Sequence, residues 1–117
     1  MRLCLRCGAG FSGEKWLCPQ CGFEPQVLGG FPAFAPELAH AEEGYDPAHF
    51  SELAELESRN FWFRNRNRLI ICPLGRLPPA AQSFLEVGCG TGFVLSGLAT
   101  AFRGLEATGS EVAAEGL

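Results

Sequence analysis

The chain has 117 residues, a net charge of −4 and an apolar fraction of 47%, which fits the usual size of one domain. The acidic balance provides no global positive field for nucleic acid, and no run approaches the 18 apolar residues of a membrane span. The N-terminus also lacks an apolar core of signal-peptide length, so we expect a soluble, cytoplasmic protein.

Two cysteine pairs open the chain, and a glycine follows each pair. The pattern is Cys4-x2-Cys7, ten residues, and Cys18-x2-Cys21. A C-x2-C turn directs two sulfurs to one point, and zinc prefers four such ligands in a tetrahedron. The duplicated spacing therefore predicts a structural metal site over a disulfide or a redox-active pair. The pattern resembles rubredoxin-like zinc ribbons, in which iron can replace zinc.

The composition divides the chain into three parts. Residues 1–24 form the predicted ribbon, with a short strand expected over residues 14–17. Residues 25–45 are rich in proline and glycine and are predicted to be a linker with little regular structure. Residues 46–117 have the patterns of helices and strands, so we expect an α/β region there.

Two helices are predicted next. Asp46 and Pro47 are typical of a helix start, as an N-cap carboxylate followed by proline at the first helical position. The apolar side chains expected to line this helix are Phe50, Leu53 and Leu56. A second helix is predicted over residues 60–71, because prolines and a glycine follow it.

A glycine-rich turn follows a predicted strand over residues 83–87. Its sequence is Glu86-Val87-Gly88-Cys89-Gly90-Thr91-Gly92. A helix over residues 93–102 and a second strand over residues 104–110 are expected after it. Glycines let the backbone approach a ligand closely, and the helix start provides free N–H groups.

Such a turn can bind a nucleoside triphosphate, a dinucleotide, or a ligand without phosphate. A triphosphate P-loop requires a lysine that this turn lacks, and a dinucleotide site requires a third glycine where Phe93 stands. Glu86 would also place a carboxylate near a pyrophosphate, which is unfavourable. The remaining alternatives are a purely structural turn with a surface glutamate and a site for a ligand without phosphate.

The pattern acidic-x-G-x-G-x-G resembles motif I of class I S-adenosylmethionine-dependent methyltransferases. In that family an acidic residue after the second strand accepts hydrogen bonds from the ribose hydroxyls, and Glu111 matches this position, 21 residues after Gly90. The resemblance implies a Rossmann-like fold, and Cys89 is expected to be a small apolar filler of the turn. The cofactor-binding residues that it implies are Glu86, Gly88, Cys89, Gly90, Thr91, Gly92 and Glu111.

The resemblance extends upstream to residues 60–71, which look like the helical lead-in of bacterial methyltransferases that begin with a cysteine ribbon. In that architecture these helices cover the cofactor cleft. The side chains that would then face the cofactor or the methyl acceptor are Trp62, Phe63, Arg64 and Arg66. The alternative is that the aromatic residues pack on the sheet and the arginines are solvated.

Only the first strand-helix-strand unit of that family's seven-stranded fold is expected here, so the sheet is predicted to be incomplete and the chain to be a truncated form. Self-association through that sheet is one expectation, and the methyl acceptor and the catalytic residues are not identified. One alternative function is a non-catalytic zinc-ribbon module that recruits RNA or protein through the ribbon and through a cluster of arginines, Arg59, Arg64, Arg66 and Arg68. A narrower one is an rRNA guanine methyltransferase, although that family usually has histidine where this chain has Cys21.

Overall fold

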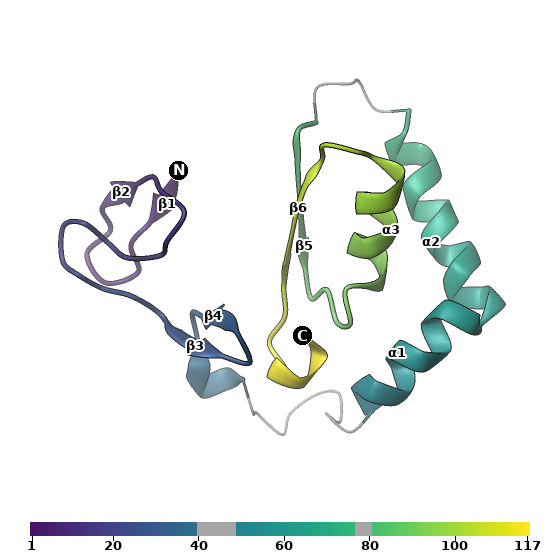
Figure 1. Ribbon diagram of the computed structural model, residues 1–117, viewed down its shortest axis with the longest axis horizontal. Helices are drawn as coiled ribbons and strands as arrows, with labels where there is room; N and C mark the ends of the chain where they lie inside the picture. The colour runs from purple at the N-terminus through teal and green to yellow at the C-terminus, as the bar shows by residue number, and fades with distance from the viewer. Residues whose placement is uncertain (40–48, 77–80) are drawn as a thin grey trace. The chain divides into compact units, whose positions relative to one another are not determined.

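The computed structural model describes residues 1–39, 49–76 and 81–117. The chain forms two compact units, Met1–Ala39 and His40–Leu117, which Figure 1 colours from purple to blue and from teal to yellow. The helix start predicted at Asp46 and Pro47 lies outside the described residues.

The first unit is built from short antiparallel strand pairs. Strand β1 (Arg2–Leu3) pairs with β2 (Gly10–Phe11), and β3 (Gln26–Leu28) pairs with β4 (Phe31–Ala33). A 3-10 helix, η1 (Pro36–Leu38), follows. The β3–β4 hairpin falls within residues 25–45, where the sequence predicted little regular structure.

The hairpin is explained by its two-residue turn. Gly29 and Gly30 both have positive φ angles, +57° and +94°, as a type I′ turn requires. That turn matches the right-handed twist of the strands, and Leu28 accordingly pairs with Phe31 across it. The Gly-Gly pair is therefore a hairpin signal and not a sign of a flexible connection.

The strand predicted over residues 14–17 is wrong, since this segment is irregular. Trp16 is instead fixed by side-chain packing. Its ring meets the Phe34 ring edge-on at 4.6 Å and the Phe11 ring at 6.3 Å, and the Arg2 guanidinium lies 4.6 Å from its centroid. A single large ring held on three sides needs no strand partner to be positioned.

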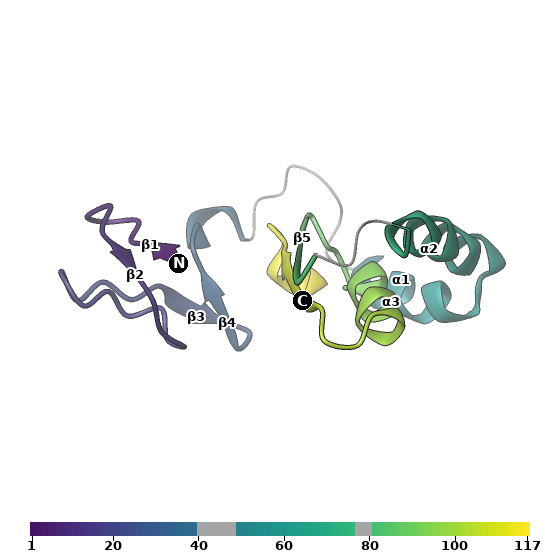
Figure 2. The same ribbon diagram turned by 90° about the horizontal axis from the view of Figure 1, so that it is seen from above.

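The second unit is an α/β arrangement with a small parallel sheet. Helices α1 (His49–Arg59) and α2 (Phe61–Leu74) precede β5 (Ser83–Val87), α3 (Phe93–Ala101) and β6 (Glu106–Ser110), and η2 (Ala114–Gly116) follows. Strands β5 and β6 are parallel, in a register that pairs Ser83 with Glu106 and Val87 with Ser110. Helix α3 lies between this strand pair and α2 (Figures 1 and 2). The predicted strand over residues 83–87 and the predicted helix after the turn are confirmed.

The two helices differ in detail from the prediction. Asn60 caps α2, because its Oδ1 accepts the Trp62 backbone N–H at 2.8 Å. In α1 the buried residues are Phe50 and Glu57, whereas Leu56, predicted to line the apolar face, is 52% exposed. Among the described helices, none has the length and apolar character needed to cross a membrane.

The sheet has one covered face. Gly109 on β6 faces Leu95 of α3, and its register partner on β5 is Glu86, so Glu86 points to the helical side. On the opposite face Leu85 and Val87 are exposed by 63% and 79%. The covered face is therefore the one that positions the carboxylate preceding the glycine turn.

Candidate functional site

The four paired cysteines form one cluster in the first unit. Their ligand atoms all lie within 4.8 Å of one another. The Sγ atoms of Cys4 and Cys21 are 3.6 Å apart, and those of Cys7 and Cys18 are 3.7 Å apart. A tetrahedron with metal–sulfur bonds of about 2.3 Å has edges of about 3.8 Å. The sulfur positions thus fit a single tetrahedral metal ion and leave no protein ligand position open.

The two C-x2-C turns have the same backbone geometry. In the first, Gly8 donates its N–H to the Cys4 carbonyl at 2.9 Å, and in the second Gly22 donates to Cys18 at 2.9 Å. Both glycines have a left-handed backbone conformation, with φ of +72° and +68°. This conformation lets the chain turn back tightly after each pair of sulfurs. The repeat of the sequence pattern is therefore also a repeat of structure.

Cys4 and Cys18 belong to the small buried core of this unit. They are 4% and 1% exposed, and Phe11 is the third buried member of that cluster. Partly buried side chains pack around them, namely Ala9, Trp16, Cys21 and Phe23. The cysteine cluster and the apolar core consequently share residues, so loss of the cluster would also open the core.

The protonation of the sulfurs is uneven. Burial raises the pKa of Cys4, but hydrogen bonds from the Cys7 and Arg6 backbones outweigh it and lower the pKa to about 6. A backbone hydrogen bond at Phe23 lowers the pKa of Cys21, yet burial and the neighbouring sulfurs together raise it to about 12. Four adjacent thiolates repel one another, and a bound cation offsets that repulsion.

The glycine turn connects β5 to α3 in the second unit. Gly88, Gly90 and Gly92 are left-handed, with φ of +73°, +52° and +74°. Gly88 and Cys89 donate their backbone N–H groups to the Ser110 carbonyl, at 2.7 and 3.0 Å. These bonds hold the turn against the end of β6, so the sequence-predicted residues gather at one end of the parallel sheet.

Glu111 closes the same end of the sheet. Its Oε2 accepts the Gly90 N–H at 2.7 Å, and its Oε1 accepts the N–H groups of Val112 at 2.7 Å and Ala113 at 3.3 Å. A carboxylate has about four acceptor positions, so about one remains. Glu111 thus organises the turn and keeps room for one further donor.

The sequence prediction missed Glu57, which supports the turn from α1. Glu57 is 8% exposed, and its carboxylate accepts a hydrogen bond from the Thr91 hydroxyl. Phe50 on the same helix lies under the turn, 3.9 Å from where a Cβ on Gly90 would stand. A glutamate seven residues after Phe50, at a helical position that otherwise faces the core, is the sequence signal for this role.

Glu86 carries an unmatched acceptor. Its Oε2 is shielded from solvent and has no hydrogen-bond partner among the described residues. Burial raises the pKa of the Glu86 carboxyl, and the charge of Arg66 offsets this only in part. The site therefore contains a carboxylate oxygen that a cationic or N–H donor from a ligand would satisfy.

Glu86→Gln is expected to stabilise the ligand-free protein at pH 7, by on the order of 1 kcal/mol. The folded pKa lies above the ordinary value of 4.5, so the folded state binds more protons and stability falls as pH rises through that interval. The gain should disappear below about pH 4, where Glu86 is protonated in both states. Urea unfolding at several pH values measures it, with the exposed Glu106→Gln as control. Equal effects of the two variants would contradict this assignment.

Cys89 and Gly109 define the floor of the turn. A Cβ on Gly109 would lie 2.7 Å from the Cys89 Sγ and 2.5 Å from the Leu95 Cδ1, so glycine is needed there for space. Burial, followed by the charges of Glu111 and Glu86, raises the pKa of the Cys89 thiol. The thiol is thus kept protonated, which suits a packing role better than that of a nucleophile.

The aromatic and basic residues of α2 fall into different environments. Phe63 is half-buried, whereas Trp62 is 54% exposed and stacks edge-on against Phe63 at 4.9 Å. Arg64 and Arg66 are exposed, with the Arg66 guanidinium 5.6 Å from the Trp62 centroid. The sequence left two alternatives for the aromatic residues of this helix, packing on the sheet or facing a ligand. Trp62 is not buried against the sheet, because more than half of its surface is exposed to solvent.

In comparisons with known proteins, no family model matches this chain, and no curated protein or solved structure is significantly similar to it.

Proposed function

We propose that this chain binds S-adenosylmethionine at the glycine turn, as part of a methyltransferase, and holds a structural zinc ion in its cysteine cluster. The observation that carries the first proposal is the 2.7 Å hydrogen bond between the Gly90 N–H and Glu111. It joins the turn after β5 to the acid after β6, and both belong to the pattern that resembles the methyltransferase motif.

The available groups match the chemistry of the cofactor. S-adenosylmethionine has an ammonium, a sulfonium and ribose hydroxyls, and the turn offers the unpartnered Glu86 oxygen and the remaining acceptor position of Glu111. The carboxylate of S-adenosylmethionine could accept hydrogen bonds from the backbone N–H groups at the start of α3. The N-cap residue there, Gly92, has no side chain that could cap them. When bound, the cofactor would supply an activated methyl group, and the residues of this chain would orient it.

The zinc proposal rests on the sulfur geometry. Four sulfurs at tetrahedral spacing leave no ligand position for a reacting water, so the role is structural. Residues 1–39 contain few buried apolar side chains, and a metal would supply the missing folding free energy. Iron fits the same ligands, and metal analysis distinguishes the two.

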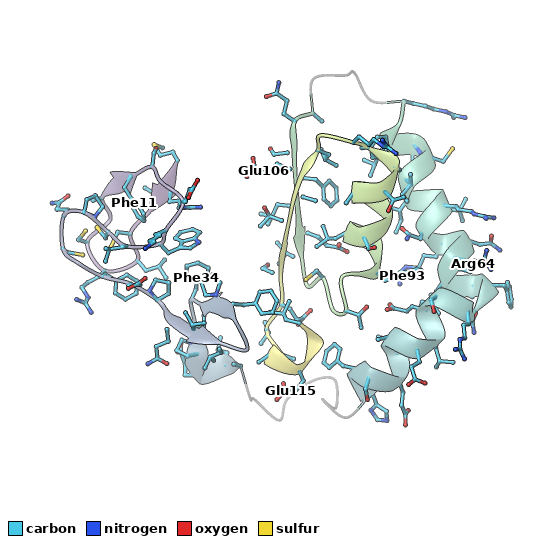
Figure 3. The ribbon with its side chains drawn as sticks, in the orientation of Figure 1. Phe11, Phe34, Arg64, Phe93, Glu106 and Glu115 are labelled. Atoms are coloured by element: carbon cyan, nitrogen blue, oxygen red, sulfur yellow. The ribbon has the colours of Figure 1, made fainter. Side chains whose placement is uncertain are left out.

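Titration calorimetry with S-adenosylmethionine tests the cofactor proposal on the full chain. Glu111→Gln is expected to weaken binding about tenfold or more, because a hydrogen bond to a charged group contributes about 1.5–3 kcal/mol. Glu106→Gln is the matched control, at the opposite end of β6 (Figure 3). Glu86→Gln should also weaken binding, although it stabilises the ligand-free protein.

Two outcomes would contradict the proposal. If NAD or ATP binds as tightly as S-adenosylmethionine, the turn does not select this cofactor. If the unaltered chain binds none of the three, the alternative of a non-catalytic metal-ribbon module is favoured.

A further inference from the structure

The outer face of α2 presents large apolar and basic side chains to solvent. Three of its side chains are apolar: Phe61, Trp62 and Leu69 are exposed by 75%, 54% and 75%. Three arginines are also exposed, Arg66 on the side of Trp62 and Leu69, and Arg64 and Arg68 on the side of Phe61. Figure 3 shows Arg64 on the solvent side of the helix. We call these six residues the α2 outer face.

The exposed side chains of α2 are not the ones that pack against α3. The opposite side of α2 already packs, through Phe63, Asn67, Ile70 and Leu74, all buried or half-buried. The Nδ2 of Asn67 donates to the Phe93 carbonyl of α3 at 3.2 Å. Helix α2 therefore has its packing partner, and the exposed aromatic residues form a second surface. Contiguous exposed apolar residues of this kind mark interaction sites.

The charge of this segment is one-sided. Residues 59–76 contain five of the nine basic residues of the chain and no acidic residue. Arg64 and Arg68 are one helical turn apart, so they present adjacent positive charges. The structure shows no ion pair for either of them among the residues that it describes. The net charge of −4 thus conceals a local basic surface.

Arg66 and Trp62 add a planar element. The Arg66 guanidinium stands 5.6 Å from the Trp62 ring centroid, which restrains the indole while leaving about half of it exposed. A restrained, exposed indole costs little entropy when it stacks on another flat group. A partner with flat faces joined by anionic groups matches the aromatic residues and the arginines together.

We propose that the α2 outer face binds single-stranded nucleic acid. Trp62 and Phe61 stack on bases, and Arg64 and Arg68 contact the phosphates. The arginines flank the three apolar side chains of this face, as phosphates flank the bases of a nucleic-acid strand. The proposed contacts use no residue of the glycine turn, although the charge of Arg66 acts on Glu86, and they do not require the proposed cofactor.

The test is fluorescence anisotropy of the full chain with a labelled 12-nucleotide oligouridine and the corresponding oligothymidine. Trp62→Ala is expected to weaken binding about tenfold. Trp62→Phe, which keeps a ring, should retain most of the affinity. In the Arg64→Gln/Arg68→Gln variant the slope of log K against log salt should become shallower by about 1.4, since each phosphate contact contributes about 0.7. Arg103→Gln removes an exposed charge outside this face and should leave binding nearly unchanged.

Circular dichroism verifies that each variant keeps its helices, so that loss of binding is not loss of fold. In a Trp16→Phe background, Trp62 is the remaining tryptophan, and its fluorescence should be quenched by either oligonucleotide. Equal losses from Arg103→Gln and from the Arg64/Arg68 variant would overturn the proposal, as would an unquenched Trp62. Binding to vesicles of anionic phospholipid without binding to oligonucleotide would overturn it in favour of a membrane surface. Preference for oligouridine or for oligothymidine supports it and identifies the nucleic acid.

Discussion

Replacing Cys18 with serine is expected to prevent metal binding at the cysteine cluster and to unfold residues 1–39, while α1, α2 and α3 keep their structure. Cys18 is 1% exposed, and its Sγ lies 3.7 Å from that of Cys7. Serine lacks the soft thiolate that zinc prefers. Binding of structural zinc contributes about 10–16 kcal/mol in small metal-dependent folds, far more than a core of three buried residues supplies.

Metal content per chain and amide NMR spectra measure this result. The Cys18→Ser chain should contain less than one metal ion, and the amide signals of the first unit should collapse to the narrow range of an unfolded segment. Cys72→Ser is the control, because Cys72 is an exposed cysteine of α2. A Cys18→Ser chain that keeps one metal per chain and a dispersed first unit would refute the metal-centre assignment. Treatment of the unaltered chain with a chelator should reproduce the effect of the substitution.

Gly97→Ala is expected to destabilise the second unit by about 1–2 kcal/mol, although alanine is normally the better helix former. Gly97 lies where α3 meets α2. A Cβ there would stand 2.4 Å from the Nδ2 and 3.0 Å from the Cγ of Asn67. Asn67 is 8% exposed and donates to Phe93, so it cannot move without losing that bond. The helix-propensity gain of about 1 kcal/mol is smaller than the combined cost of overpacking and the lost hydrogen bond.

A double-mutant cycle isolates the cause. In an Asn67→Ala background the obstruction is gone, so Gly97→Ala should become neutral or stabilising. Ser96→Ala, at the neighbouring exposed position of α3, shows how this helix responds to alanine where no Cβ is added. Urea unfolding followed by the helical circular dichroism signal gives the free energies. If the Gly97→Ala variant is as stable as the parent chain, the prediction is wrong, because α2 and α3 would then make room for the added methyl group without loss of stability.

The regular elements of the second unit were predictable because local patterns determine them. The strand over residues 83–87 is a short apolar run before glycines, and the helix after it has an apolar period. The side-chain assignment in α1 was not predictable in the same way. Hydrophobicity favoured Leu56 as the buried residue, but the Thr91 hydroxyl satisfies Glu57 and makes its burial possible. That partner is 34 residues away in the sequence, beyond the reach of a helical pattern.

The first unit shows the opposite limitation. The cysteine spacing predicted a cluster of four sulfurs, and the structure brings them together. The predicted strand at residues 14–17 was wrong. β-propensity describes local preference, whereas Trp16 is positioned by packing against the rings of Phe11 and Phe34. Local chemistry did contain the signal for the β3–β4 hairpin, in the Gly29-Gly30 turn. A proline- and glycine-rich composition obscured it.

The position of Glu111 came from a motif, whereas its hydrogen bonds came from the fold. Counting residues from Gly90 placed an acid after the second strand. Only the parallel pairing of β5 and β6 brings its Oε2 to 2.7 Å from the Gly90 nitrogen. A sequence pattern can therefore identify the members of this site, but their mutual contacts depend on tertiary structure.

The glycine turn is restricted by handedness and not by room. A Cβ on Gly88 or Gly92 would meet no atom within 4 Å, yet their φ angles of +73° and +74° are disfavoured for L-residues by about 1–2 kcal/mol. Mirror-image side chains would fit both positions without strain. Among the genetically encoded residues, asparagine and aspartate are the least costly replacements. Most substitutions at these two glycines are therefore unfavourable because of the backbone conformation, although there is room for a side chain.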